Sequence, residues 1–377
     1  MDYREKLCFR TELYNHEQSD ALFLEAARSN VDCHILHCRE YREIAKRQGF
    51  TVRCLETAAD LWKIPCIPTL YYKSHRPMSA ADSSLVVTAT SSGTGGAVSR
   101  IGFDGRSLFF AAGAAARLIA YHGLFSPVPV HYLILGYQPH PGNETVITKT
   151  QNLYTLFAPA LSREYAIKWL GGSYRPDIGG LLKALKRYER SGAPVRIVGF
   201  PAYLSILLKR LKKEGISCRL PGRSLILSGG GWKQFYGERV EKREMYRLAE
   251  EVLGIPESRF REFFGAAEHP GVYCDCKNHH FHIPSISRVI IRDVVSLKPL
   301  GFGQAGLVNL ISPLVESMPL TSVVTDDLGI LHPGDECGCG IQTPYLELLG
   351  RTGVPGIHTC AAGAAGLLKE VERRAFS

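Results

Sequence analysis

The sequence has no apolar run of the roughly 18 to 20 residues that a membrane-spanning helix requires, which argues against an integral membrane protein. Its charged first residues, Met1–Lys6, lack the apolar core of a secretory signal. Internal repeats and low-complexity linkers are also missing. No G-x4-G-K-[ST] spacing exists, which excludes a Walker A nucleotide-binding loop. These absences leave a globular cytoplasmic protein as the expectation.

What is present is the composition of an ordinary globular protein, with 45% apolar and 21% charged residues over 377 positions. A chain of this length can bury the cores of two lobes. Eleven cysteines, an odd number, fit a reducing compartment better than a disulfide framework. The net charge of +9 is spread over amphipathic helical patterns such as residues 207–213, so we expect solvated helix faces and no nucleic-acid partner.

The pattern along the chain predicts an α/β enzyme. Residues 195–199, 201–213 and 224–228 indicate a strand, a helix and a strand, and this βαβ unit implies a parallel sheet with helices on its faces. From about residue 280 the pattern changes to short strands, which predicts a smaller β-rich region. The other expected elements are helices over 11–49, 105–121, 178–190 and 232–253, and strands over 84–88, 131–135, 287–294, 306–311, 321–325 and 344–349.

The first expected helix contains Cys33, His34, His37 and Cys38, which together have the composition of a metal cluster. On a helix, His34 shares one face with His37 and Cys38, so the spacing permits a metal site. Packing of an amphipathic helix surface is the commoner outcome for such a pattern. We therefore expect these side chains to be structural.

Two glycine-rich loops suit a nucleotide. The first follows the strand at 84–88 and runs from Thr90 to Gly96. Its glycines let backbone N–H groups approach phosphate oxygens closely, and its hydroxyls add rotatable donors. The second, Ser228–Lys233, lies between a strand and a helix, where the helix N-terminus favours anions. A single loop of this kind is more often an ordinary turn, so the loops gain meaning only with the motifs that follow them.

Two acidic motifs and an arginine lie farther along the chain. Glu268 follows two small residues and suits the oxygen coordination of a hard cation such as Mg²⁺, the alternative being a surface glutamate. Asp326 and Asp327 end an apolar strand and project carboxylates that can accept hydrogen bonds from ribose hydroxyls, the alternative being a turn cap. Gly350-Arg351 closes the last expected strand.

The order of these motifs resembles that of the adenylate-forming superfamily, which includes acyl-CoA synthetases and luciferases and activates carboxylates with ATP. The loop departs from the usual pattern, because Val98 and Ser99 stand where proline and lysine are common, with Arg100 as the nearest cation. In this respect, and over nearly the whole chain, the sequence is similar to the acyl-protein synthetases of bacterial luminescence operons, the LuxE family. The resemblance implies the adenylate-forming N-terminal fold without the usual C-terminal domain.

The resemblance implies one adenylate-forming domain over residues 1–350, with lobes of about 1–222 and 223–350, and a tail over 351–377. Proteins of this family carry an acyl-accepting cysteine close to the C-terminus, and Cys360 occupies such a place. A thiolate can attack an acyl-adenylate, and a position before an expected helix lowers the pKa of the thiol. His358 is the candidate base, and an unreactive tail cysteine is the alternative.

The same resemblance implies roles for individual residues. Glu268 binds magnesium, Asp327 contacts the ribose, and Arg351 reaches the ribose or the phosphates. Lys233 is the candidate cation at the phosphates, because the domain that normally supplies the catalytic lysine is expected to be missing. His269 is a further candidate contact to the phosphates or the carboxylate. The expected ATP-binding residues are Ser91, Ser92, Gly93, Thr94, Gly95, Gly96, Gly229, Gly230, Gly265, Ala266, Asp327 and Arg351.

Two C-x-C pairs with histidines between them form a cluster that does not depend on ATP. Soft thiolate ligands and tight turns of this kind are typical of a structural zinc site. A set of reduced loop thiols without metal is the alternative. The expected ligands are Cys276, His282, Cys337 and Cys339, with Cys274 as the reserve.

The sequence therefore predicts a ligase that converts a carboxylic acid, expected to be a fatty acid, and MgATP into acyl-AMP and pyrophosphate. The acyl group would then pass to Cys360 and on to a partner acyl reductase. A first alternative keeps the adenylation but uses coenzyme A or a carrier protein as acceptor, as in the related phenylacetate-CoA ligases. A second alternative is an inactive, zinc-stabilised binding scaffold.

Overall fold

The chain divides into two compact units, and one of them is discontinuous in sequence. Unit 1 comprises Met1–Tyr121 and Gly265–Ser377, and unit 2 comprises the intervening His122–Phe264. The expected lobe boundary near residue 222 stays a prediction, because a lobe of a fold family need not coincide with a compact unit. The computed structural model describes residues 2–90, 99–141, 152–230 and 240–351.

Helices form the first part of unit 1. They are α1 (Tyr3–Arg10), α2 (His16–His37), α3 (Arg39–Arg47), α4 (Tyr71–Ser74) and α5 (Gly105–Tyr121). The bounds of α5 match the prediction, but the helix predicted over 11–49 is interrupted. Asn15 accepts a hydrogen bond from the N–H of Gln18 at 3.0 Å and so begins α2. Cys38 has an extended backbone, which separates α2 from α3.

Short strands from the second half of the sequence build the main sheet of unit 1. The strands of the unit are β1 (Ile67–Pro68), β2 (Leu85–Thr90), β3 (Arg100–Asp104), β10 (Tyr273–Cys274), β11 (Phe281–His282), β12 (Arg288–Arg292), β13 (Ala305–Ile311), β14 (Ser322–His332) and β15 (Tyr345–Arg351). The antiparallel order is β11–β15–β14–β13–β12, with β1 parallel to β14, and β2 pairs with β3 separately. The β-rich region predicted from about residue 280 is confirmed.

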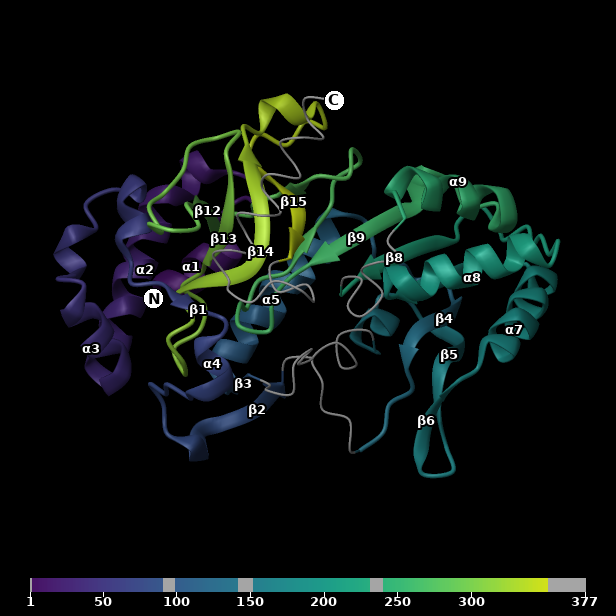
Figure 1. Cartoon of the computed structure of the whole chain (residues 1–377), viewed down its shortest axis with the longest axis horizontal. Helices are drawn as coiled ribbons and strands as arrows, with labels where there is room; N and C mark the ends of the chain where they lie inside the picture. The colour runs from purple at the N-terminus through teal and green to yellow at the C-terminus, as the bar shows by residue number, and fades with distance from the viewer. Residues whose placement is uncertain (1, 91–98, 142–151, 231–239, 352–377) are drawn as a thin grey trace. The chain divides into compact units, whose positions relative to one another are not determined.

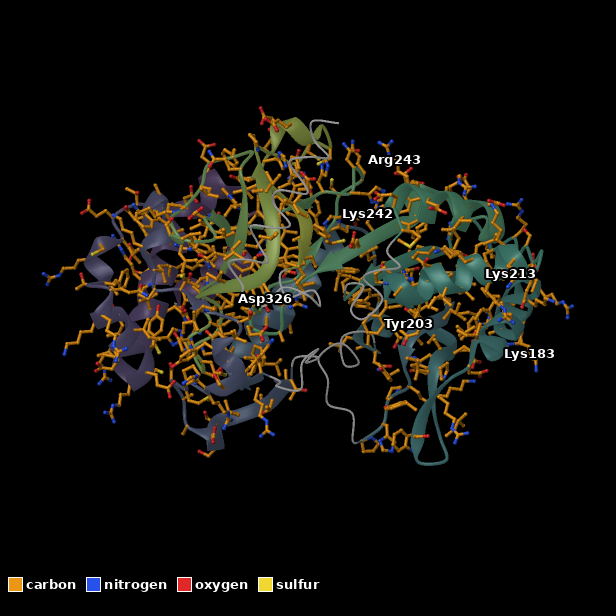
Figure 2. The ribbon with its side chains drawn as sticks, in the orientation of Figure 1. Lys183, Tyr203, Lys213, Lys242, Arg243 and Asp326 are labelled. Carbon is orange, nitrogen blue, oxygen red and sulfur yellow. The ribbon has the colours of Figure 1, made fainter. Side chains whose placement is uncertain are left out.

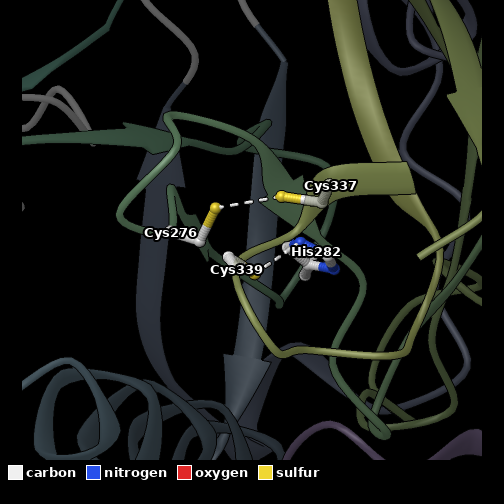
Figure 3. Close-up of side chains that lie close together, drawn as sticks. All are labelled: Cys276, His282, Cys337 and Cys339. Atoms are coloured by element: carbon white, nitrogen blue, oxygen red, sulfur yellow. Dashed lines mark hydrogen bonds between the residues drawn. The ribbon is translucent and has the colours of Figure 1, made fainter. Parts of the chain in front are cut away.

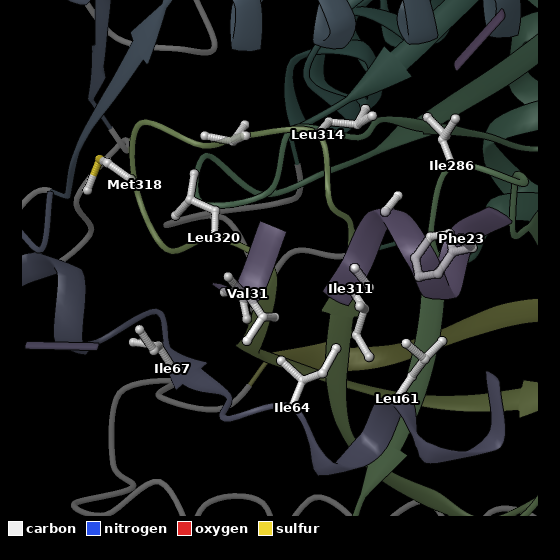
Figure 4. Packing of buried hydrophobic residues seen from close by; sticks show 14 of the residues in the cluster. Phe23, Val31, Leu61, Ile64, Ile67, Ile286, Ile311, Leu314, Met318 and Leu320 are labelled. Carbon is white, nitrogen blue, oxygen red and sulfur yellow. The ribbon is translucent and has the colours of Figure 1, made fainter. Parts of the chain in front are cut away.

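The apolar core of unit 1 joins its N-terminal helices to its C-terminal sheet. Phe23 and Val31 of α2 pack in one cluster with Ile311 of β13 and with Leu314 and Val323. Figure 4 shows several of these side chains converging between the helix and the strands, and Figure 1 shows α2 beside β12 and β13. Each such buried side chain contributes about 1.5–3 kcal/mol. The two distant stretches of sequence are therefore one folded body.

Unit 2 is a parallel sheet with helices. Its strands are β4 (Val130–Tyr137), β5 (Ala160–Leu170), β6 (Ser173–Pro176), β7 (Val195–Gly199), β8 (Leu225–Gly229) and β9 (Phe260–Phe264), and its helices are α7 (Ile178–Ser191), α8 (Pro201–Lys213) and α9 (Lys242–Leu253). Within the unit the order is β9–β8–β7–β4–β5–β6, and neighbours run parallel except β5 and β6. The predicted βαβ unit is confirmed as β7–α8–β8.

Local signals in unit 2 set the ends of its helices. Asp177 accepts a hydrogen bond from the N–H of Gly180 at 2.8 Å and begins α7, which Gly192 ends in the left-handed conformation. Pro201 stands at the start of α8, where its missing N–H leaves no hydrogen bond unmade. Of the helix predicted over 232–253, the described part begins only at Lys242.

Several basic residues of unit 2 lie on its helices, as Figure 2 shows for Lys183, Lys213, Lys242 and Arg243. Lys183, Lys213 and Arg243 are exposed. For these three residues the placement agrees with the expected solvated helix faces, whereas Arg196 is buried on β7. None of the described helices has the length and apolar character needed to cross a membrane.

Candidate functional site

The acidic motif of β14 lies opposite the arginine that ends β15. Asp327 pairs with Arg351 in the strand register, and Arg351 Nε lies 3.7 Å from Asp327 Oδ1. The buried Thr325 hydroxyl donates to the Val308 carbonyl at 3.2 Å and accepts the Asp327 N–H at 3.2 Å. Thr325 thus fixes the backbone that presents Asp327. Two of the predicted nucleotide contacts are cross-strand neighbours.

The charges around Asp327 oppose each other. Burial raises the pKa of Asp327, the Arg351 guanidinium lowers it, and the neighbouring Asp326 carboxylate raises it again. Asp326 lies on the same strand, where Figure 2 labels it. A partly buried carboxylate of this kind gains stability when a cation or hydroxyl donors approach it. Asp327 and Arg351 are therefore suited to a ligand that carries a cation or hydroxyl groups.

Glu268 belongs to the same cluster of charges. It lies in a turn four residues after β9 and is 5% exposed. Burial raises the pKa of Glu268, while a hydrogen bond with Ser99 and the charge of Arg351 lower it and Asp326 raises it. The structure thus brings Glu268, Asp326 and Arg351 within electrostatic reach of one another inside unit 1. Ser99 was not predicted as a site residue, although it stands where lysine is usual in the superfamily.

The oxygen atoms of this cluster fit a hard cation. The Asp326 carboxylate raises the pKa of Glu268, and a divalent cation between two carboxylates relieves this repulsion. Carboxylate oxygens are the ligands that Mg²⁺ prefers in nucleotide sites. The residues present are thus compatible with the magnesium that the fold family implies.

His269 is a buried, neutral side chain in the described structure. Its Nε2 lies 3.1 Å from the Tyr273 hydroxyl, which lies 2.5 Å from Ser287 Oγ, and Ser287 donates to the Ile311 carbonyl at 3.1 Å. Burial lowers the pKa of His269 to about 3. An added Cβ at Gly271 would lie 2.8 Å from His269 Nε2, so this glycine leaves room for the ring. The predicted contact of His269 with phosphate or carboxylate stays a prediction.

The remaining predicted nucleotide contacts are divided between the two units. At Gly265 a Cβ would make only an ordinary contact, 3.5 Å from the Gly271 carbonyl, so the described neighbours do not require glycine there. Gly229 ends β8 in unit 2, and Gly230, which follows the strand, has a φ of +89°. Their predicted roles, and that of Ala266, stay predictions. The predicted residues that lie outside the described part of the chain are Ser91, Ser92, Gly93, Thr94, Gly95, Gly96, Lys233, His358 and Cys360.

A second cluster lies elsewhere in unit 1, where the two C-x-C pairs meet. The ligand atoms of Cys276, His282, Cys337 and Cys339 all lie within 4.8 Å of one another. Figure 3 shows their side chains pointing toward a common centre. Burial and the neighbouring thiols raise the pKa of Cys337 to about 12. These four are the ligands predicted from the sequence, and Cys274, the predicted reserve, is not a member of the group.

The cysteine and histidine residues of α2 take the structural role that was expected. His34 is fully buried, and its Nδ1 lies 2.7 Å from Ser79 Oγ. Its ring packs edge-on against Tyr41 at 5.7 Å. Cys38 is buried in the core of unit 1. Packing therefore accounts for His34 and Cys38, whereas Cys33 is half-buried and His37 is exposed.

Comparison with known proteins adds three findings. A sequence profile of the family described as acyl-protein synthetase, LuxE, matches residues 8–368. The long-chain-fatty-acid–luciferin-component ligase of Vibrio harveyi is 26% identical over 327 residues, covering 85% of this chain and 82% of that protein. The protein of the same name from Aliivibrio fischeri is 22% identical over 313 residues, covering 82% and 79%.

Among solved structures, an open conformation of 2-hydroxyisobutyryl-CoA ligase in complex with 2-HIB-AMP and CoA matches with a TM-score of 0.68. The sequences are 16% identical, and the match covers 90% of this chain and 76% of the other. At this identity the likeness shows the fold alone. The predicted adenylate-forming fold is therefore confirmed.

Proposed function

The chain belongs to the acyl-protein synthetase family LuxE and is a ligase, and from this premise we propose that it activates a long-chain fatty acid with MgATP. The fatty-acid carboxylate attacks the α-phosphorus of ATP, and the bond from that phosphorus to the bridging oxygen breaks. The products are acyl-AMP and pyrophosphate. The grouping of Glu268, Asp327 and Arg351 in unit 1 is the observation that supports this reaction.

Each charged residue of the group has a distinct proposed role. Glu268 would hold Mg²⁺, which when bound neutralises phosphate charge during the displacement. Asp327 accepts hydrogen bonds from the ribose hydroxyls, because Thr325 presents its carboxylate in a fixed position. Arg351 is 57% exposed and is free to extend from Asp327 toward a phosphate oxygen. The phosphate contacts predicted for Ser91–Gly96 and for Lys233, all outside the described residues, remain part of this proposal as sequence-based predictions.

The second step of the proposal is acyl transfer to Cys360. The Cys360 thiolate attacks the carbonyl carbon of acyl-AMP, the bond from that carbon to the phosphate oxygen breaks, and AMP leaves with the electron pair. His358 would accept the thiol proton. The acyl group of this thioester then passes to a partner acyl reductase, which leaves the Cys360 thiol free. We propose a cytoplasmic location for both steps, where thiols stay reduced.

Intact-protein mass spectrometry tests this proposal. The wild type, Cys360→Ser and the control Cys218→Ser are incubated with MgATP and a mixture of fatty acids, and pyrophosphate is measured in parallel. Cys218 is a buried cysteine of unit 2 and serves as the matched control. We expect a hydroxylamine-labile acyl adduct on the wild type and on Cys218→Ser, and none on Cys360→Ser.

Two other results would contradict the proposal in different ways. Pyrophosphate release without an adduct on any of the three proteins would show that the acceptor is a separate molecule such as coenzyme A or a carrier protein. Absence of both pyrophosphate exchange and adduct would leave a binding scaffold without the activation step. The acyl mass on the wild type would also identify the preferred chain length.

A further inference from the structure

The four side chains of the thiol cluster come from two segments that are distant in sequence. Cys276 and His282 flank a tight turn between β10 and β11, and Cys337 and Cys339 lie in the connection between β14 and β15. Cys276 Sγ lies 3.6 Å from Cys337 Sγ, and Cys339 Sγ lies 3.2 Å from His282 Nε2. In a tetrahedral zinc site, Zn–S bonds of about 2.3 Å and Zn–N bonds of about 2.0 Å place ligand atoms roughly 3.5–3.8 Å apart. The observed separations are close to these edges.

We propose that Cys276, His282, Cys337 and Cys339 bind one structural Zn²⁺ ion through three thiolates and the His282 Nε2 atom. The inference does not rest on the proposed reaction, because it concerns a site made by other residues. Three thiolates and one imidazole are the ligand set of a closed structural zinc centre, which keeps no position for water or substrate.

The hydrogen bond of His282 orients its ring as a zinc site requires. Its Nδ1 lies 2.7 Å from the Thr343 carbonyl oxygen. A carbonyl oxygen can only accept a hydrogen bond, so Nδ1 carries the proton and Nε2 keeps its lone pair. This Nε2 is the atom that faces the Cys339 thiol. A backbone carbonyl on the distal nitrogen is the usual outer-sphere partner of a metal-binding histidine.

The two turns that carry the thiols share one local geometry. The N–H of Asn278 lies 3.3 Å from Cys276 Sγ, and the N–H of Ile341 lies 3.4 Å from Cys339 Sγ, so each sulfur accepts a bond from the residue two positions later. These N–H groups orient the two sulfur atoms toward the centre of the cluster. Gly338 and Gly340 have φ values of +68° and +102°, which let the second turn fold tightly.

Two neighbouring residues, His280 and Asn278, make further contacts with Cys337. His280 Nδ1 lies 3.1 Å from Cys337 Sγ, and its ring stacks on Tyr345 at 4.2 Å. Asn278 also donates through Nδ2 to the Cys337 carbonyl at 2.6 Å, which joins the two turns directly. A disulfide between Cys276 and Cys337 would leave His282 and Cys339 facing each other without a shared partner. A metal ion at the centre of the cluster would be bound by all four side chains.

The position of the proposed ion gives it a role in the fold. The first turn continues the segment that begins with Glu268, and the second turn connects the strands that carry Asp327 and Arg351. An ion at this place would link these two segments of unit 1. Loss of the ion should therefore loosen both the acidic turn and the β14–β15 hairpin, and thereby weaken the charged cluster.

Metal analysis of the purified full-length protein tests the inference without substrate. The protein is expressed with added zinc, and bound zinc is measured by elemental mass spectrometry for the wild type, Cys339→Ser and the control Cys274→Ser. Cys274 is a buried neighbour that is not among the four ligands. We expect one zinc per chain for the wild type and for Cys274→Ser, and at least tenfold weaker retention against a chelator for Cys339→Ser.

A second measurement keeps the test valid if Cys339→Ser does not fold. Wild-type protein is stripped of metal with a chelator and refilled with Co²⁺, whose absorption reports tetrahedral thiolate coordination. We expect intense d–d and thiolate charge-transfer bands that one equivalent of Zn²⁺ removes, and a lower Tm for the stripped protein. Wild-type protein that holds no zinc and binds no Co²⁺ overturns the inference, as does a Cys276–Cys337 disulfide in freshly purified, metal-free protein.

Discussion

Unit 1 and unit 2 differ in the chemical character of what they bury. Among the described residues, the buried polar side chains of unit 2 are few, namely Thr155, Arg196, Ser205, Ser224 and Ser228. Unit 1 buries many more, including Glu268, His269, Arg288, Arg292 and Asn309. Buried polar groups must be satisfied by specific partners, whereas apolar groups require only contact and shape. The charged candidate groups Glu268, Asp327 and Arg351 lie in unit 1, whose interior is specified by polar contacts.

The polar contacts of unit 1 connect its two stretches of sequence. Arg288 of β12 lies 2.6 Å from Asp20 of α2 and stacks over Phe23 at 4.3 Å. Asn30 of α2 donates to the Val315 carbonyl at 2.7 Å. Such pairs hold the helices in one register against the sheet, which apolar contacts alone do not determine. Unit 2 has a continuous chain and relies on local periodicity instead.

The largest expected difference between a substitution in unit 1 and one in unit 2 is the loss of activity in Glu268→Gln. Loss of the carboxylate charge should slow ATP–pyrophosphate exchange about 10²–10³-fold, the cost of removing one electrostatic contact to the transition state. The matched control is Glu262→Gln in unit 2, where Glu262 pairs with Lys242. Equal losses in both variants would contradict a special role for Glu268.

The stability of Glu268→Gln sharpens the same test. Burial raises the pKa of Glu268 above its ordinary value, so ionisation of this carboxyl costs stability as the pH rises through the raised pKa. Glutamine cannot ionise and avoids this cost. We expect the variant to unfold in urea at a concentration equal to or higher than the wild type at pH 7. A clear loss of stability would mean that Glu268 serves the fold.

A smaller but still large effect is expected in the apolar core of unit 2. Leu207 of α8 is fully buried, and Leu207→Ala should lower the free energy of unfolding by about 2–5 kcal/mol. Adenylation per folded molecule should not change, because Leu207 carries no charged group toward a ligand. Urea unfolding with Leu170→Ala, an exposed position in unit 2, as control checks this. A comparable loss in both variants would overturn the description of the core.

For Asp327→Asn we expect weaker ATP binding with little change in fold. Loss of a charged hydrogen-bond acceptor should raise the KM for ATP about tenfold, equivalent to about 1.4 kcal/mol. Glu347→Gln, on β15 and paired with His332 at 2.8 Å, is the control. An unchanged KM in Asp327→Asn would show that the ribose is held by other groups.

The smallest expected effect is a change in how steeply the free energy of unfolding depends on pH, tested with a variant of His34. Burial lowers the pKa of His34 to about 3 from an ordinary 6.5, so the folded state binds fewer protons in this range. The contribution to stability is complete above pH 6.5 and falls by about 1.4 kcal/mol for each pH unit between 6.5 and about 3. His34→Asn should flatten the pH dependence of urea unfolding. His75→Asn, at an exposed position, should retain the wild-type slope.

Local periodicity and capping made much of the structure predictable. The βαβ unit of β7, α8 and β8 and the helix Gly105–Tyr121 follow from apolar spacing within short windows. The C-x-C pairs predicted the four converging thiol and imidazole ligands, because tight turns hold such pairs together. Two features of the helix predicted over 11–49 were missed: α2 begins only after the capping residue Asn15, and Cys38 separates α2 from α3 although the helical pattern continues on both sides.

Other features depend on contacts between distant residues and could not be read from the sequence. The joining of the first 121 residues to those after 264 rests on packing such as that of Phe23 against Ile311. Ser99 beside Glu268 is a contact of the same kind. The burial of His269 also depends on its surroundings, since neither Tyr273 nor Gly271 indicates by itself that the ring is enclosed.

The placement of unit 2 between the two stretches of unit 1 has a consequence for synthesis. At roughly 5–20 residues per second, the ribosome needs on the order of 10–40 s to proceed from the end of α5 to β13. During that interval unit 2 can fold from its own continuous sequence. The apolar face of α2 stays exposed to solvent until the strands that cover it have been synthesised. The nascent chain is thus most prone to aggregation, and most in need of a chaperone, while its later half is still being translated.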